Sequence, residues 1–173
     1  MTEMIRNKVQ ESGLINMDLA DFKPNRMRLI GFDLKDFLWQ ELVLKEKDFR
    51  ARLKEFDWNQ FEGKSVFVHC SADAIVPTWA FMLVSSYLSE AGVQHLIGGQ
   101  MDLEKWMIRE KIGALNPMDY QDGRIIIKGC SDITAPEFAM TELLKFLQPL
   151  AKSIMYGEPC STVPIYKRAK AQT

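Results

Sequence analysis

Three cysteines are the residues of this 173-residue sequence whose type and placement indicate chemistry. Cys70, Cys130 and Cys160 each follow an apolar run that is typical of a buried strand, and a serine comes directly after each of them. The apolar runs are residues 66–69, 125–127 and 154–156. Because the thiolate form of cysteine binds soft metals and attacks electrophiles, these positions predict one functional site built from three thiols.

A metal is the natural partner of such a site. Thiolates within a few ångströms repel one another, so bringing them together without a cation would be costly. Three thiolates with one further ligand suit zinc, and they also suit an iron–sulfur cluster with one iron left open. The sequence lacks the Cys-x-x-Cys spacing of common zinc sites. The prediction therefore requires that Cys70, Cys130 and Cys160 meet in space and bind the metal together.

Acidic side chains near the cysteines could supply an oxygen ligand or a proton. The candidates are Asp73, Asp132 and Glu158. Glu158 lies between a glycine and a proline just ahead of Cys160, which favours a side chain that faces the site. Asp73 has an equally good explanation as a turn or helix-capping residue. Asp73 and Glu158 are thus the preferred groups beside the thiols.

The serines beside the cysteines have two explanations. Ser71, Ser131 and Ser161 could donate hydrogen bonds to sulfur and tune the site. Serine near a helix start is also an ordinary capping residue, and for each serine alone this is the simpler explanation. The histidines do not complete the ligand set. His69 points to the opposite face of its strand from the neighbouring cysteine, and His95 opens a strand at the far end of the sheet.

A thiol enzyme is the main alternative to a metal centre. Residues 68–72 resemble the opening of the cysteine phosphatase loop, in which a strand delivers a thiolate to phosphorus. That loop needs an arginine where this sequence has Val76, and Asp73 would place a negative charge at the phosphate position. A sulfur carrier with Cys70 as the nucleophile needs only one thiolate and stays open. The third alternative is a non-catalytic binding domain with buried free cysteines, although their polar neighbours fit burial poorly.

The elements that must position these residues alternate between strands and helices from about residue 65. Strands are expected at 66–69, 95–97, 124–128 and 153–156, and helices at 77–91, 102–112 and 136–147. This alternation predicts a three-layer α/β domain with a mainly parallel sheet and βα repeats. In such folds ligands bind beyond the carboxyl ends of the strands, which is where all three cysteines are expected.

The first part of the chain departs from this alternation. Residues 14–19 and 28–34 alternate in polarity on either side of a turn at 23–25, so an N-terminal antiparallel strand pair is expected. A helix is expected at 43–56. The whole chain is expected to form a single α/β domain, with the strand pair and helix in 1–60, the βα core in 61–166 and a short basic tail in 167–173.

Composition argues against several classes of function. A formal net charge of −1 gives no electrostatic footprint for nucleic acid. The longest apolar run, residues 74–88, is too short for a membrane span and contains Pro77 and two serines. The first residues lack the apolar core of a signal peptide. An odd number of cysteines without an export signal predicts a reducing, cytoplasmic location.

Five segments of the sequence carry a family resemblance. They are residues 12–15, 44–50, 70–80, 128–131 and 157–164, of which the last is the most specific. On these segments the chain resembles the bacterial family catalogued as Domain of Unknown Function 2480. The family brings no established activity to transfer. Its loose association with iron–sulfur assembly genes implies iron–sulfur assembly proteins as partners, and it favours an iron–sulfur cluster over zinc.

Overall fold

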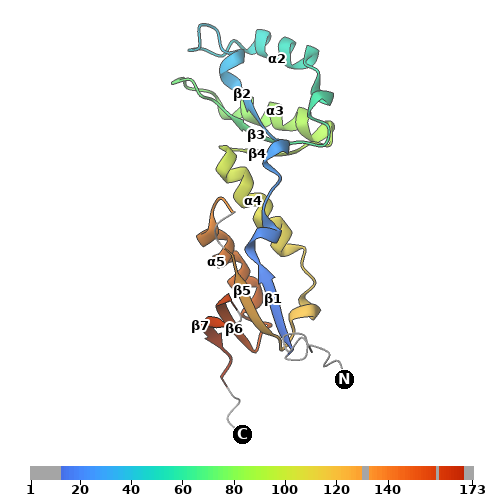
Figure 1. The fold of residues 1–173 in the computed structure, drawn as a ribbon. Coiled ribbons are helices and arrows are strands. Elements are labelled where there is room, and N and C mark those ends of the chain that lie inside the picture. Colours follow the sequence, from blue (N-terminus) through green and yellow to red (C-terminus); the bar gives the residue numbers. More distant parts are fainter. Residues whose placement is uncertain (1–12, 130–132, 159, 170–173) are drawn as a thin grey trace, which may run out of the picture. The chain divides into compact units, whose positions relative to one another are not determined.

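The computed structural model describes residues 13–129, 133–158 and 160–169, whose helices and strands are labelled in Figure 1. The chain forms two compact units. Unit 1 contains the described residues up to Pro24 and from Met107 onward, and unit 2 contains Asn25–Trp106. Each unit has its own sheet and its own hydrophobic core. The prediction of a single domain over residues 1–173 concerns how these units combine, and it stays a prediction.

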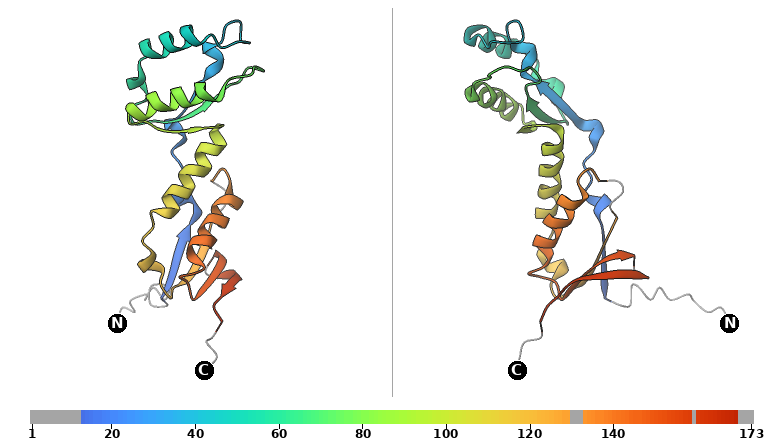
Figure 2. Two further views of the ribbon diagram at one scale, coloured as in Figure 1. Left: turned by 180° about the vertical axis from the view of Figure 1, so that it is seen from behind. Right: turned by 90° about the vertical axis from the view of Figure 1, so that its left-hand side faces the viewer.

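Unit 2 is built on a three-stranded parallel sheet in the order β2-β3-β4. Its elements in chain order are the 3-10 helix η2 (Arg26–Arg28), β2 (Leu29–Asp33), η3 (Leu34–Phe37), α2 (Glu46–Glu55), η4 (Trp58–Phe61), β3 (Ser65–His69), α3 (Thr78–Glu90), β4 (Gln94–Ile97) and the first half of α4 (Gln100–Gly113). Helix α2 links β2 to β3, and α3 links β3 to β4. Both helices lie on one face of the sheet, as the right-hand view of Figure 2 shows.

The core of unit 2 fills the space between the sheet and these two helices. Val66 and Val68 of β3 are fully buried and belong to one apolar cluster with Val84 and Leu88 of α3. Phe32 of β2 adds an aromatic cluster at ring-centroid distances of 5.2–6.2 Å, with Phe37, Phe56, Trp58 and Phe61. The period-two burial of β3 and the apolar stripe of α3 therefore decide which face of the sheet is covered.

Unit 1 has a four-stranded sheet in the order β1-β5-β6-β7. Its elements are β1 (Leu14–Asp18), η1 (Leu19–Phe22), the second half of α4, η5 (Pro117–Tyr120), β5 (Arg124–Lys128), α5 (Pro136–Leu147), β6 (Ser153–Glu158) and β7 (Ser161–Lys167). The first three strands are parallel, and β7 runs antiparallel to β6. Buried Ile125, Ile127 and Ile154 pack with α5 and α4 on one face of this sheet.

The predicted α/β class and the mainly parallel pairing are confirmed, with the strands divided between two sheets. The predicted N-terminal antiparallel pair is wrong, because β1 pairs in parallel with β5 and β2 pairs in parallel with β3. The segment at 23–25 joins two 3-10 helices: Asn25 caps η2 through Met27 N, and no hairpin turn forms there. Alternating polarity indicated half-buried strands correctly but does not specify a neighbouring strand.

Two further findings bear on the predictions. Strand β7 was not expected, and Arg168 of the expected basic tail donates to the Leu150 carbonyl at 2.6 Å and pairs with Asp122. Among the helices that the structure describes, none is both long and apolar enough to cross a membrane.

The two units begin with the same short sequence. The pattern Leu-Ile-x-x-Asp-Leu-x-Asp-Phe occupies residues 14–22 and again residues 29–37. In each copy a strand ends at an aspartate that caps the following 3-10 helix. The carboxylate of Asp18 accepts a hydrogen bond from Ala20 N at 3.0 Å. The carboxylate of Asp33 accepts one from Lys35 N at 2.9 Å. The strand order β1-β5-β6 in unit 1 thus repeats the order β2-β3-β4 in unit 2.

Candidate functional site

Cys70 lies directly after β3, at the carboxyl end of the parallel sheet of unit 2. Its side chain is half-buried and packs against the apolar core of that unit, on the side of α2 and α3. The thiol donates a hydrogen bond to the carbonyl of Ala72, with a sulfur–oxygen distance of 3.7 Å. Cys70 therefore behaves in part as a small apolar side chain of the core.

Asp33 is the best-connected polar group at this end of the sheet. Its carboxylate accepts hydrogen bonds from Lys35 N at 2.9 Å, from Ser71 N at 3.0 Å and from the Ser71 hydroxyl at 2.5 Å. Burial by itself raises the pKa of Asp33, but the hydrogen bonds from Ser71 and Lys35, with a smaller contribution from His69, lower the pKa overall. An ionised Asp33 thus ties the loop after β3 to the end of β2. Ser71, expected beside sulfur, donates its hydroxyl to this carboxylate.

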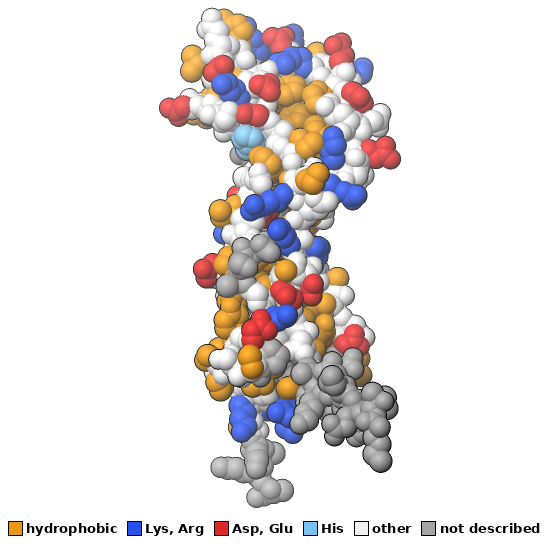
Figure 3. Space-filling model, viewed as in Figure 1, with side chains coloured by type: hydrophobic (Ala, Val, Ile, Leu, Met, Phe, Trp, Pro, Cys, Tyr) orange, Lys and Arg blue, Asp and Glu red, His pale blue; other side chains and the backbone are white. Residues whose placement is uncertain are grey.

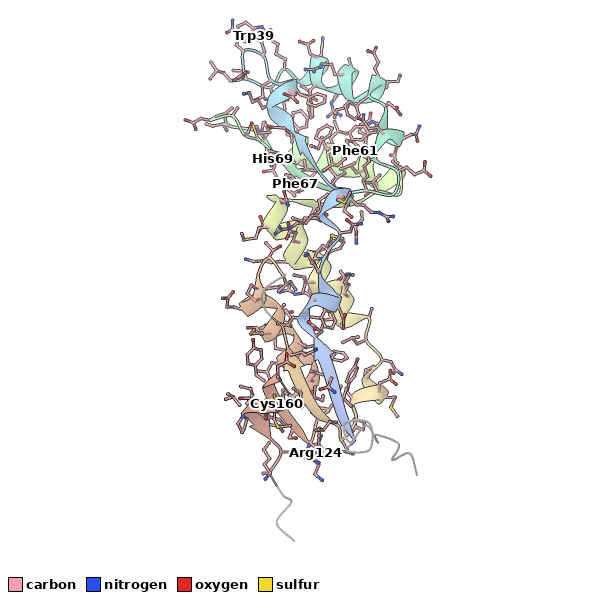
Figure 4. All side chains as sticks on the ribbon, in the orientation of Figure 1. Trp39, Phe61, Phe67, His69, Arg124 and Cys160 are labelled. Carbon is pink, nitrogen blue, oxygen red and sulfur yellow. The ribbon has the colours of Figure 1, made fainter. Side chains whose placement is uncertain are left out.

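His69 lies on the other face of β3 and forms a small aromatic shelf with Phe67. Their rings stack with centroids 5.3 Å apart. Both residues are labelled in Figure 4. Gly31 of β2 lies beneath this pair, and a Cβ atom there would be 2.9 Å from the Phe67 ring and 3.2 Å from His69 Nε2. The prediction that His69 and Cys70 point to opposite faces is confirmed, since Cys70 packs on the helix side.

Cys160 lies in the turn between β6 and β7 of unit 1 and is exposed (Figure 4). The antiparallel register sets Glu158 opposite Ser161 on the two sides of this turn, and both residues are exposed. The predicted neighbours Glu158, Cys160 and Ser161 are therefore brought together by a hairpin. The sequence had indicated a strand and a loop here without the returning strand.

Strand β5, the parallel neighbour of β6, leads toward Cys130. Cys130, Ser131 and Asp132 lie outside the described residues, so the description of this strand end stops at Gly129. Gly129 has φ +79°, and the carboxylate of Asp18 occupies the space that a Cβ atom would need. Asp18 also forms an ion pair with Lys128 at 3.6 Å. Asp18 and Glu158 are thus acidic groups at the carboxyl ends of strands in this sheet.

The expectation that all three cysteines follow strands of one sheet is wrong. Cys70 follows β3 of the unit 2 sheet, whereas Cys130 and Cys160 follow β5 and β6 of the unit 1 sheet. Asp73 is exposed in the loop between β3 and α3. Among residues 13–129, 133–158 and 160–169, no three His, Cys, Asp or Glu side chains lie close enough together to hold a metal ion.

Sequence reasoning missed Asp33 and its counterpart Asp18. Strands β1 and β2 are followed by no cysteine, so the thiol pattern did not predict a functional residue at their ends. The available signal was the repeated Leu-Ile-x-x-Asp pattern, which places an aspartate at the carboxyl end of a strand in both units.

The fold and these strand ends define an α/β protein with one parallel and one mainly parallel sheet, and with cysteines that follow three of the strands. The chain belongs to the family described as "Protein of unknown function (DUF2480)", which matches residues 3–168 and confirms the resemblance seen in the sequence. Comparison with curated proteins and with solved structures finds no match.

Proposed function

We propose that the cysteines of this protein bind a metal centre, an iron–sulfur cluster in preference to zinc. The proposed ligands are Cys130 and Cys160 of unit 1 together with Cys70 of unit 2, with Glu158 or Asp73 as the further oxygen ligand. The proposed role is an accessory one in iron–sulfur cluster metabolism in the cytoplasm, with iron–sulfur assembly proteins as partners. No reaction is assigned to the centre.

The observation that supports this proposal is the placement of two thiols after neighbouring parallel strands. Cys160 is exposed two residues beyond the end of β6, and Cys130 comes two residues beyond the end of β5. Glu158 at the end of β6 and Asp18 at the end of β1 add carboxylates at the same edge of the sheet. Thiolate and carboxylate groups at the carboxyl edge of a parallel sheet are suitable ligands for a metal.

The contribution of Cys70 decides between the two metals. The proposed iron–sulfur cluster uses three thiolates with one further ligand, so it requires Cys70 as well as the two cysteines of unit 1. Zinc accepts two thiolates completed by carboxylates, and such a site would leave Cys70 in its packed position against the core. Replacing Cys70 therefore separates the two centres.

Metal analysis of protein purified without oxygen tests the proposal. With a cluster, the fresh protein carries iron and acid-labile sulfide, and Cys70→Ala, Cys130→Ser and Cys160→Ser each abolish both. With zinc, the Cys130→Ser and Cys160→Ser variants lose the metal, whereas Cys70→Ala retains it. Ser161→Ala is the matched control in the same hairpin and should retain the metal. Protein without stoichiometric iron or zinc, or metal content unchanged in Cys130→Ser and Cys160→Ser, would contradict the proposal.

The thiol-enzyme alternative takes second place because of the environment of Cys70. A nucleophilic thiol must be accessible as thiolate, whereas this side chain packs against apolar residues and donates to a backbone carbonyl. The measurement is the rate of alkylation by iodoacetamide at pH 7. A Cys70 rate far above that of the exposed Cys160 would favour the enzyme or sulfur carrier over the metal centre.

A further inference from the structure

Basic side chains at the start of β5, just before β6 and at the end of β7 meet in a groove on the sheet of unit 1. The groove has a volume of about 470 Å³ and is lined by Arg124, Lys152, Ser153, Met155, Pro164, Tyr166, Lys167 and Arg168. Arg124 and Met155 alternate along their strands with buried Ile125 and Ile154, so they point to the face opposite α5. Lysine and arginine side chains are visible around this end of unit 1 in Figure 3.

The cations of this groove differ in how they are held. Arg168 is fixed, because it pairs with Asp122 and donates to the carbonyls of Leu150 and Pro149. The other three cations, Arg124, Lys152 and Lys167, are exposed. On a chain whose total charge is −1, this local excess of positive charge favours an anionic ligand.

The remaining walls of the groove are apolar. Met155, Pro164 and the half-buried Tyr166 provide them, next to the cationic side chains. A volume of this size is within the range of small-molecule sites, about 300–1,000 Å³. The combination suits a ligand with a planar apolar body and an anionic group, since the body can lie against Tyr166 and Met155 while the anion meets the cations.

Two features argue against a larger anionic partner. Pro164 has no backbone N–H, so β7 is a poor edge for the addition of an acidic peptide strand. At the other end of the same sheet face the charge is mixed, because Asp18 pairs with Lys128 at 3.6 Å. A long polyanion would therefore find cations only at one end of the sheet.

From this groove we infer that unit 1 binds a phosphorylated small molecule of nucleotide size, with the phosphates at Arg124, Lys152 and Lys167 and the ring against Tyr166, Met155 and Pro164. The site lies at the amino ends of β5 and β6. It is independent of the proposed metal centre, which concerns the carboxyl ends of the same strands.

Fluorescence anisotropy with a methylanthraniloyl derivative of ADP tests the inference on the full-length protein. Saturable binding is expected, with the Kd about fivefold weaker in Arg124→Gln or Lys167→Gln and about 25-fold weaker in the double variant. Lys47→Gln, an exposed lysine on α2 of unit 2, is the matched control and should bind like the wild type. Circular dichroism confirms that each variant is folded.

Competition identifies which part of the ligand is recognised. Unlabelled ADP should displace the probe at lower concentration than pyrophosphate or adenosine alone, and a single-stranded oligonucleotide of twelve thymidines should displace it no better than ADP. Absence of saturable binding up to millimolar probe, equal binding by the double variant, or displacement by pyrophosphate as effective as by ADP would overturn the inference. Stronger displacement by the oligonucleotide would replace it with single-stranded nucleic acid binding.

Discussion

The two units use the same opening strand for different purposes. In unit 2, Asp33 at the end of β2 accepts three hydrogen bonds and ties down the loop that contains Ser71. In unit 1 the equivalent Asp18 caps the next turn and pairs with Lys128, while its carboxylate fills the space over Gly129. The repeated sequence thus places a carboxylate at the carboxyl end of a strand in both sheets. The residues after the neighbouring strand determine which groups that carboxylate binds.

The position of the cysteine differs in the same way. Cys70 in unit 2 packs against the core, whereas Cys160 in unit 1 is exposed on a hairpin. The carboxyl end of the unit 2 sheet is thus closed by local hydrogen bonds and packing. External ligands should therefore meet the exposed groups of unit 1 first, and the proposed iron–sulfur cluster would additionally require Cys70 to leave its packed position.

The largest effect on stability is expected from shortening a buried leucine side chain in the core of either unit. Leu88 of α3 and Leu147 of α5 are fully buried in the cores of unit 2 and unit 1. Each change to alanine should lower the free energy of unfolding by about 2–5 kcal/mol. Hydrogen exchange measured by mass spectrometry should show lost protection in unit 2 for Leu88→Ala and in unit 1 for Leu147→Ala. Equal loss across both units in either variant would show that the two cores do not act separately.

Replacing the aspartates at the strand ends should lower the free energy of unfolding by less, and by more for Asp33 than for Asp18. Asp33→Ala leaves two amides and one hydroxyl without their acceptor, and a loss of about 2 kcal/mol is expected. Asp18→Ala removes one capping hydrogen bond and a partly exposed ion pair, so about 1 kcal/mol is expected. Urea unfolding measures both. A larger loss for Asp18→Ala than for Asp33→Ala would reverse the contrast between the units.

The pH dependence of stability should distinguish Asp33 from Glu142 on α5. Hydrogen bonds from Arg109 and Lys145 lower the pKa of Glu142, and hydrogen bonds from uncharged groups, Ser71 above all, lower that of Asp33. Because both folded pKa values are lowered, each carboxylate contributes stability above its ordinary pKa of about 4, and this stability is lost as the pH falls through the folded value. Asp33→Asn and Glu142→Gln should each flatten the acid limb of the stability curve.

Salt separates these two effects. In 0.5 M NaCl the contribution of Glu142 should shrink, because its partners are exposed cations, whereas that of Asp33 should persist. The measurement is urea unfolding between pH 5 and pH 3 at low and high salt. If the contribution of Asp33 to stability disappeared at high salt, its lowered pKa would be caused by nearby charge and not by hydrogen bonds.

The smallest effect is expected at the aromatic shelf of unit 2. Gly31→Ala should cost about 1 kcal/mol, since the Phe67 and His69 rings must shift to admit a Cβ atom. The residue at the same place in unit 1 is Asn16, which is exposed, and Asn16→Ala should change stability by less than about 0.5 kcal/mol. Thermal unfolding compares the two. Similar losses of stability for both changes would mean that the Phe67 and His69 rings move aside at no measurable cost.

Much of the local structure was predictable, and the pairing of the strands was not. The apolar runs before Cys70 and Cys130 became β3 and β5, and Pro136 starts α5 as expected. These features depend on nearby residues. Which strand lies beside β1 depends on contacts more than one hundred residues away along the chain, and alternating polarity carries no information about them.

The candidate site was predictable only in part for the same reason. The hairpin that holds Glu158, Cys160 and Ser161 required the returning strand β7, which Pro164 made hard to recognise because proline is rare inside strands. The role of Asp33 was not predictable from nearby residues, because it depends on Ser71, which is 38 positions away. The repeated pattern at residues 14–22 and 29–37 was the one signal that could have shown it.

The most direct measurement is X-ray absorption spectroscopy of the metal in protein purified without oxygen, for the wild type and for Cys160→Ser. The proposed centre requires sulfur atoms bonded directly to iron or zinc in the wild type and loss of that metal when Cys160 is changed. A metal bound only through oxygen and nitrogen, or the same sulfur coordination in both proteins, would contradict a thiolate centre at the hairpin of unit 1.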